Sequence, residues 1–257
     1  MIEEIRNELT RIEEQNDIRI LLAVESGSRA WGFASTDSDW DVRYIYIHRR
    51  DWYLRIDNYK DSKEEILPND IDLAGWEMRK ALKLFRKSNP PMLEWLRSPI
   101  VYREQFSTAE RLRELSEKYF NARSCMYHYL SMAKGNFNEF LKDRDLVKIK
   151  KYFYVLRPVL ACDWIESKKT FPPMEFEKLV ESQVSDETVC KAISDLLVRK
   201  MGGEELKEEP RIEVLNKYLS GKIGYYSGVV GEVDTVDKPQ TDILDELFRS
   251  TLKEVWN

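Results

Sequence analysis

Apolar residues in the first hundred positions of the chain follow two different spacings. Between residues 2 and 15 they recur every three or four positions, which predicts an amphipathic helix. Two compact runs, residues 18–25 and 39–47, carry apolar groups on both faces and predict buried inner strands. After a charged, turn-rich stretch over 51–70, the predicted elements are a strand over 70–77, helices over 78–85 and 92–97, and a short edge strand over 98–102.

Beyond about residue 105 the spacing of apolar residues becomes helical throughout. Long helices are predicted over residues 122–142 and 146–167, and Pro158 is expected to kink the second. The other helix signals are a capping box at Ser107 and Glu110, a capping Asp186 whose helix closes at Gly202 and Gly203, and a last helix over 242–256.

This change of spacing predicts an α+β fold with two domains. Residues 1–104 are expected to form a small mixed sheet with helices on one face. Residues 105–257 are expected to form a helical domain.

Composition and charge narrow the function classes. The 257 residues carry a net charge of −5, which argues against a protein that coats nucleic acid but leaves a local basic cleft open. Three widely spaced cysteines and two histidines favour neither a disulfide framework nor a zinc site. The charged, helical start does not resemble a signal peptide, and no apolar run is long enough to span a membrane, so we expect a cytoplasmic protein.

The segment over residues 25–46 combines the groups that a metal–nucleotide site needs. Asp39 and Asp41 are two positions apart on a predicted strand, so their side chains share a face and can hold one or two divalent cations. Magnesium prefers carboxylate oxygens together with substrate phosphates. Gly27 and Ser28 form a turn after the preceding strand, where the backbone N–H groups and the Ser28 hydroxyl can contact a phosphate.

These residues carry a resemblance to a known family. Gly27-Ser28 followed by Asp39-x-Asp41 resembles the signature of the DNA-polymerase-β nucleotidyltransferase superfamily. The fuller string ESGSRAWGF…SDWDVRYIY resembles a narrower group, the nucleotidyltransferases associated with RNA-repair pathways, which includes a phage T4 relative. The likeness continues through residues 71–102, 127–137 and 150–165 and weakens after about residue 170.

The resemblance implies a polymerase-β-like nucleotidyltransferase head followed by a helical domain, with further site residues. In that superfamily a third carboxylate lies on a later strand beside the Asp-x-Asp strand, which matches Asp72, with Asp70 as the alternative on the same face. The resemblance implies that Asp72 is a third metal ligand and helps to activate the acceptor hydroxyl. Arg29 and Arg43 are expected either to contact phosphate or to pair with Glu25 or the two aspartates. Lys134, Lys151 and Arg157 of the helical half could present positive charge to a triphosphate or RNA, the alternative being a solvated helix face.

The function implied is a magnesium-dependent transfer of a nucleoside monophosphate from an NTP such as ATP to an acceptor hydroxyl, with manganese as the alternative ion. By resemblance the acceptor is an RNA end, in RNA repair or tRNA modification. The alternatives are nucleotidylation of a protein, as in AMPylation, and a catalytically silent scaffold that binds nucleotide or RNA. The presence of both aspartates speaks against the silent scaffold. The sequence does not indicate an oligomeric state.

Overall fold

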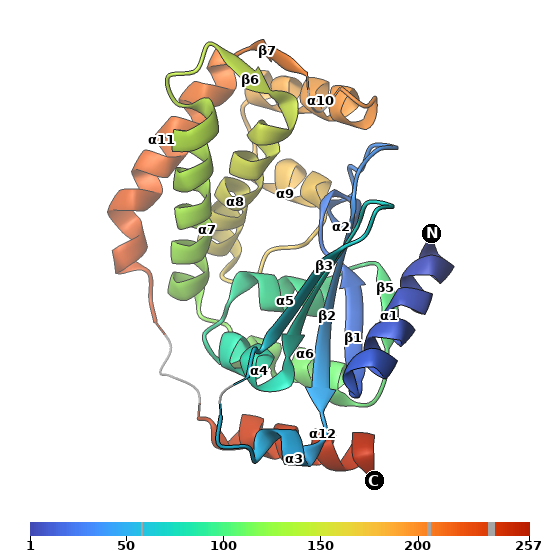
Figure 1. The fold of residues 1–257 in the computed structure, drawn as a ribbon. Helices are drawn as coiled ribbons and strands as arrows, with labels where there is room; N and C mark the ends of the chain where they lie inside the picture. The colour runs from blue at the N-terminus through green and yellow to red at the C-terminus, as the bar shows by residue number, and fades with distance from the viewer. Residues whose placement is uncertain (58, 205–206, 236–239) are drawn as a thin grey trace. The chain divides into compact units, whose positions relative to one another are not determined.

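The computed structural model describes residues 1–57, 59–204, 207–235 and 240–257. Its contacts divide the chain into two compact units. The first unit comprises residues 1–30, 39–119 and 237–257, and the second comprises residues 31–38 and 120–236. Figure 1 shows the elements of both units in chain order.

The first unit contains the predicted mixed sheet, in the order β3-β4-β2-β1-β5. Central β2 pairs in parallel with β4 and antiparallel with β1, and the two remaining strand pairs are also antiparallel. The α+β fold class is therefore confirmed. The strands are β1 (Ile18–Glu25), β2 (Trp40–His48), β3 (Ser62–Ile66), β4 (Ile71–Glu77) and β5 (Val101–Glu104).

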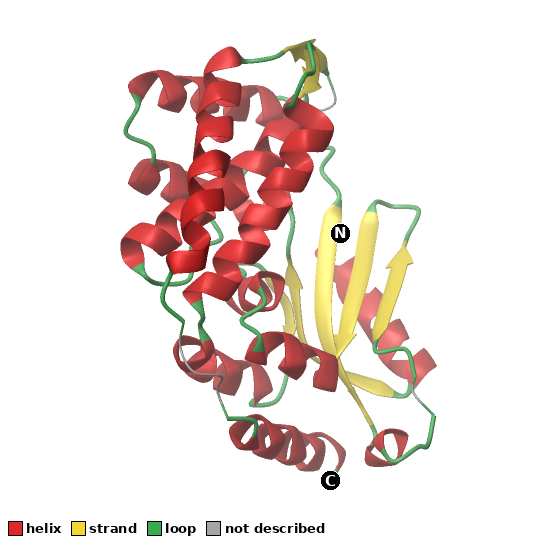
Figure 2. Ribbon diagram, turned by 90° about the vertical axis from the view of Figure 1, so that its left-hand side faces the viewer, coloured by secondary structure: helices red, strands yellow, loops and turns green. Residues whose placement is uncertain are grey.

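Helices cover both faces of this sheet, so the expectation of helices on one face is wrong (Figure 2). Helix α1 (Ile2–Asn16) packs its apolar stripe against the face formed by Val42, Tyr44 and their neighbours. On the opposite face, Trp76 of β4 stacks on Trp95 of α5 (Pro90–Arg97), with ring centroids 3.8 Å apart. Both faces need helices because β1 and β2 bury side chains on both sides of the sheet.

Three more helices complete the first unit: α3 (Arg50–Tyr53), α4 (Met78–Arg86) and α6 (Thr108–Tyr119). Helix α12 (Asp242–Trp256) also belongs to it and has the bounds predicted from sequence. The predicted capping box at Ser107 is wrong, because the partner of this residue is not Glu110. Its backbone N–H and hydroxyl both donate to the carboxylate of Glu254 in α12, at 2.8 and 2.7 Å.

The second unit is helical and has its own core. Its main elements are α7 (Ala122–Asn136), a π-helical turn (Phe137–Leu141), α8 (Ile149–Lys168), α9 (Phe176–Gln183), α10 (Glu187–Met201) and α11 (Glu213–Val229). Short β6 (Leu146–Lys148) and β7 (Glu208–Pro210) pair antiparallel, and a 3₁₀ turn (Val230–Glu232) follows α11. Helix α8 continues through Pro158, and Asp186 caps α10 as predicted, accepting hydrogen bonds from the N–H groups of Thr188 and Val189.

The units differ from the predicted domains at residues 1–104 and 105–257. Contacts assign α6 and α12 to the sheet unit, because α12 binds Ser107 and packs with α4 and α6. Residues 31–38 join the helical unit, because Phe33 packs between Phe153 and Phe176 at centroid distances of 4.7 and 5.3 Å. Among the described residues, no helix is long and apolar enough to cross a bilayer.

Candidate nucleotidyltransferase site

The Gly27 turn follows directly on β1 and leads into the short helix α2 (Ser28–Trp31). A Cβ atom on residue 27 would lie 1.7 Å from Oδ2 of Asp41, so only glycine fits beside this carboxylate. The backbone N–H of Ser26 donates to the carbonyl of Asp41 at 2.9 Å. The turn and the start of β2 therefore lie in direct contact, as a shared site requires.

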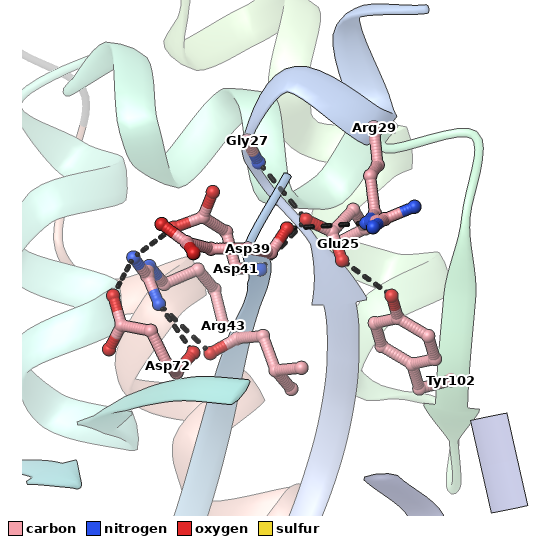
Figure 3. Close-up of polar contacts among 9 residues, drawn as sticks. Glu25, Gly27, Arg29, Asp39, Asp41, Arg43, Asp72 and Tyr102 are labelled. Carbon is pink, nitrogen blue, oxygen red and sulfur yellow. Dashed lines mark hydrogen bonds and ion pairs between the residues drawn. The ribbon is translucent and has the colours of Figure 1, made fainter. Parts of the chain in front are cut away.

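Glu25 is a site residue that the sequence prediction missed. Its side chain is fully buried, and its Oε1 accepts hydrogen bonds from the backbone N–H groups of Asp41 (2.9 Å) and Gly27 (3.4 Å). Its Oε2 accepts a hydrogen bond from the hydroxyl of Tyr102 (Figure 3). One carboxylate thus joins the glycine turn, β2 and β5. The signal in the sequence was an acid that ends an otherwise apolar strand run.

Asp41 and Asp72 are direct neighbours across the parallel pair of β2 and β4. The guanidinium of Arg43 lies between them: its Nη2 is 3.0 Å from Oδ1 of Asp41 and 2.8 Å from Oδ2 of Asp72 (Figure 3). Its Nη1 donates to the carbonyl of Asp72 at 2.9 Å. Of the two alternatives for Arg43, the structure shows pairing with the aspartates.

Burial raises the pKa of Asp41 above its ordinary value, and the carboxylates of Asp72 and Asp39 add to this rise. The charge of Arg43 lowers that pKa in part. Burial likewise raises the pKa of Glu25. The hydrogen bonds that Glu25 accepts from Tyr102 and from two backbone N–H groups lower this pKa in part. The region therefore holds negative charge that one guanidinium only partly neutralises.

Asp39 is exposed and lies one residue before β2, beside Asp41 in Figure 3. Arg29 donates from Nε to the carbonyl of Asp39 at 3.2 Å and stacks over the ring of Trp40 at 3.7 Å. The structure thus brings Asp39, Asp41 and Asp72 to one end of the sheet, around the turn at Gly27 and Ser28.

Asp70 does not lie on β4 with Asp72, contrary to the expectation that the two share a strand face. It is exposed in the turn before the strand, and its φ of 60° is in the left-handed region. The alternation of side chains along a strand therefore does not extend to it. Its carbonyl instead accepts the backbone N–H of Trp40 at 2.8 Å.

The acidic groups at this end of the sheet have the chemistry of magnesium ligands. Within the described part of the chain, no three His, Cys, Asp or Glu side chains form a group that could hold a metal by themselves. Magnesium is usually bound by one or two carboxylates, with substrate phosphates and water as the remaining ligands. Asp39 and Asp41 fit that arrangement, and Asp72 lies beside Asp41. Arg43 pairs with both Asp41 and Asp72.

The three predicted cationic contacts of the helical half belong to the second unit. Lys134 is half-buried in α7. Lys151 lies 3.5 Å over the ring of Phe140, and burial together with the neighbouring Lys150 lowers its pKa. Arg157 is 5% exposed, with its guanidinium 4.6 Å from the ring centre of Trp31, and packing within the helical unit accounts for this position.

The chain is similar in sequence to a known protein family and to a bacterial relative. Residues 1–250 match the sequence profile of the RNA repair pathway DNA polymerase beta family. The protein described as uncharacterized protein YcgL from Bacillus subtilis (strain 168) is 46% identical over 256 residues, covering 100% of this chain and 98% of the relative. A nucleotidyltransferase-like protein from Exiguobacterium sibiricum 255-15 aligns over 91% of this chain and 81% of its own, with a TM-score of 0.31 and 15% identity.

The family match extends over the whole helical unit and over the sheet unit up to residue 250, and so includes the glycine turn and the three aspartates described above. The relative from Bacillus subtilis is similar along the same length. The chain therefore belongs to the RNA repair pathway DNA polymerase beta family.

Proposed function

We propose that the protein is a metal-dependent nucleotidyltransferase that moves a nucleoside monophosphate from an NTP to a hydroxyl at an RNA end. The observation that carries this proposal is the Asp41 carboxylate, which lies against the backbone of Gly27 and beside Asp72. The turn proposed to bind phosphate and the acids proposed to bind metal thus lie at one end of the sheet. Family membership supports both the reaction class and the RNA acceptor.

The roles of the residues follow from their positions. The N–H groups and hydroxyl of the Gly27–Ser28 turn would bind the triphosphate, since glycine allows a phosphate to approach the backbone closely. Asp39 and Asp41 would hold magnesium, or manganese in its place. When bound, the ion would neutralise the phosphate charge and favour attack by the acceptor hydroxyl. Glu25 keeps the turn and β2 together, and Arg43 fixes the separation of Asp41 and Asp72.

In the reaction, the oxygen of the acceptor hydroxyl forms a bond to the α-phosphorus of the NTP. The bond from that phosphorus to the bridging oxygen of the β-phosphate breaks, and pyrophosphate leaves. Asp72 is proposed to assist the acceptor hydroxyl, whose proton must be lost in this step. Lys134 and Lys151 are proposed to add positive charge for the triphosphate or RNA.

The test is incubation of the protein with each α-³²P-labelled NTP, magnesium or manganese, and either total RNA or lysate protein. Label on RNA that is lost in Asp41→Asn but kept in Asp57→Asn, at an exposed acid outside the site, is the expected result. Label on protein alone would replace the RNA acceptor by protein nucleotidylation. Absence of label with every NTP would contradict transferase activity and favour a silent binding scaffold.

A further inference from the structure

Helix α4 carries an unusually basic surface for an acidic protein. Residues 78–87 contain five Lys and Arg residues and no Asp or Glu, although the whole chain has a net charge of −5. The apolar side chains of this segment face the core, and Arg79, Lys83, Arg86 and Lys87 are exposed. Such a one-sided cationic helix attracts polyanions.

A cavity of about 240 Å³ opens between this basic surface and helix α12. Its lining includes the cations Arg79, Lys83 and Arg86 and the apolar side chains of Leu82, Leu244 and Phe248. Asp245 is an acid in the same cavity. Nearby, Lys80 pairs with Asp61 at 3.1 Å. The cations still outnumber the acids around the cavity.

Aromatic side chains extend the same surface toward α3, which Figure 1 shows beside α12. Trp52 stacks on His48 with a centroid distance of 4.1 Å and an interplanar angle of 6°, and Tyr59 lies 5.6 Å from Trp52. Tyr59 is 46% exposed. The guanidinium of Arg79 lies 5.8 Å from the ring centre of Trp52, so the aromatic and basic groups are continuous.

We propose that this surface, which we name the α4 face and define by Trp52, Tyr59, Arg79, Lys83 and Arg86, binds a single-stranded segment of the acceptor RNA. This inference rests on the proposed function. Cationic side chains that follow a phosphate backbone, interleaved with exposed rings on which bases stack, are the combination that single-stranded nucleic acid requires. A small anion has no bases that could stack on these rings.

The α4 face lies away from the aspartates, at the other end of β4. Asp72 is the second residue of that strand, whereas Glu77 is its last and caps the start of α4. Five residues of strand span roughly 16 Å. An RNA whose reacting end lies at the aspartates can therefore reach the α4 face only if it has several nucleotides, which makes the α4 face a site for longer acceptors.

The binding test uses a fluorescein-labelled single-stranded RNA of twenty nucleotides, without NTP or metal, at several salt concentrations. Lys83→Glu/Arg86→Glu should weaken RNA binding by at least about 10-fold. The slope of log affinity against log salt concentration should also become shallower, by an amount equivalent to the loss of about one to two phosphate contacts. The matched control, Lys178→Glu/Lys191→Glu at exposed positions of the helical unit, has the same change of charge and should stay within about 2-fold. Equal losses of RNA affinity in both double variants, or no RNA binding by the wild type, would overturn the proposal that the α4 face binds RNA.

A second variant keeps the test valid if charge reversal unfolds the protein, which thermal melting would reveal. Tyr59→Ala removes one exposed ring and should weaken RNA binding about 5-fold or more, by loss of one stacking contact. In transfer assays, the α4-face variants should raise the KM of the twenty-nucleotide acceptor and leave kcat with a dinucleotide acceptor unchanged. If RNA binding depends on the α4 face but no transfer is found, only the proposed function is contradicted. If transfer to long RNA is the same in the wild type and these variants, only the proposed role of the α4 face is contradicted.

Discussion

The carboxylate of Asp41 occupies the space in which a side chain on Gly27 would begin. An added Cβ would lie 1.7 Å from its Oδ2 and 2.7 Å from its Cγ. Gly27→Ala should therefore displace Asp41 and reduce transfer on the order of 100-fold or more, as expected when one electrostatic element of a catalytic site is lost. Single-turnover transfer measures this effect. In the matched variant Gly135→Ala, the added Cβ meets no atom within 4 Å, so activity should be kept.

Asp41→Asn and Asp39→Asn should each abolish transfer while the fold persists. The amide keeps the shape of the carboxylate but removes the charge that a magnesium ligand supplies. Since burial and two neighbouring carboxylates raise the pKa of Asp41, loss of its charge should leave the melting temperature equal or slightly higher. Near-normal transfer by either variant would exclude the two-aspartate site, and circular dichroism melts would detect unfolding.

Asp72→Asn should lower kcat far more than NTP affinity, on the order of 100-fold, because its proposed role concerns the acceptor hydroxyl. Asp70→Asn should be mild, since Asp70 is exposed in a turn and asparagine tolerates its positive φ. NTP binding and single-turnover transfer, measured for both variants, make the comparison. If Asp70→Asn loses transfer and Asp72→Asn keeps it, Asp70 and not Asp72 is the third acid.

The raised pKa of Glu25 predicts a pH dependence of stability. The native state binds the carboxyl proton of Glu25 more tightly than the unfolded state does. Ionisation of Glu25 therefore lowers the free energy of unfolding as pH rises from the ordinary pKa of a glutamate through the raised pKa of Glu25. Below that ordinary pKa, Glu25 is protonated in both states and this loss of stability is absent. In Glu25→Gln that contribution disappears. The difference in unfolding free energy between variant and wild type should grow from pH 4.5 to pH 8, as measured by urea denaturation. A constant difference would show that Glu25 does not titrate differently on folding.

Magnesium should raise the melting temperature of the wild type, because a ligand that binds only the native state stabilises it. Arg43→Gln should destabilise the metal-free protein by about 1–3 kcal/mol, since Asp41 and Asp72 lose their charged partner. The same variant should gain more from magnesium, whose charge no longer competes with a guanidinium. The double variant Arg43→Gln/Asp41→Asn should lose that gain. An equal magnesium shift in all three proteins would place the ion elsewhere.

Local sequence patterns determined most of the elements of this protein. The bounds of β1 and α12 were predicted to the residue, because a compact apolar run and a helical stripe each depend on nearby residues alone. The glycine turn and the Asp-x-Asp segment were recognisable for the same reason. Strand β3 was missed because its sequence, SKEEI, is charged and mostly exposed, and only pairing with β4 makes it a strand.

Tertiary structure alone decided how the charged groups pair. Ser107 has a glutamate three residues away, yet it binds Glu254, which is 147 positions distant in sequence. Arg43 could have faced a phosphate, but the parallel pairing of β2 with β4 brings Asp72 beside Asp41 and places the guanidinium between them. Spacing along the chain fixes which side chains share a face. Which charges meet across strands depends on strand order and register, and these follow from burial of both sheet faces rather than from any local run of residues.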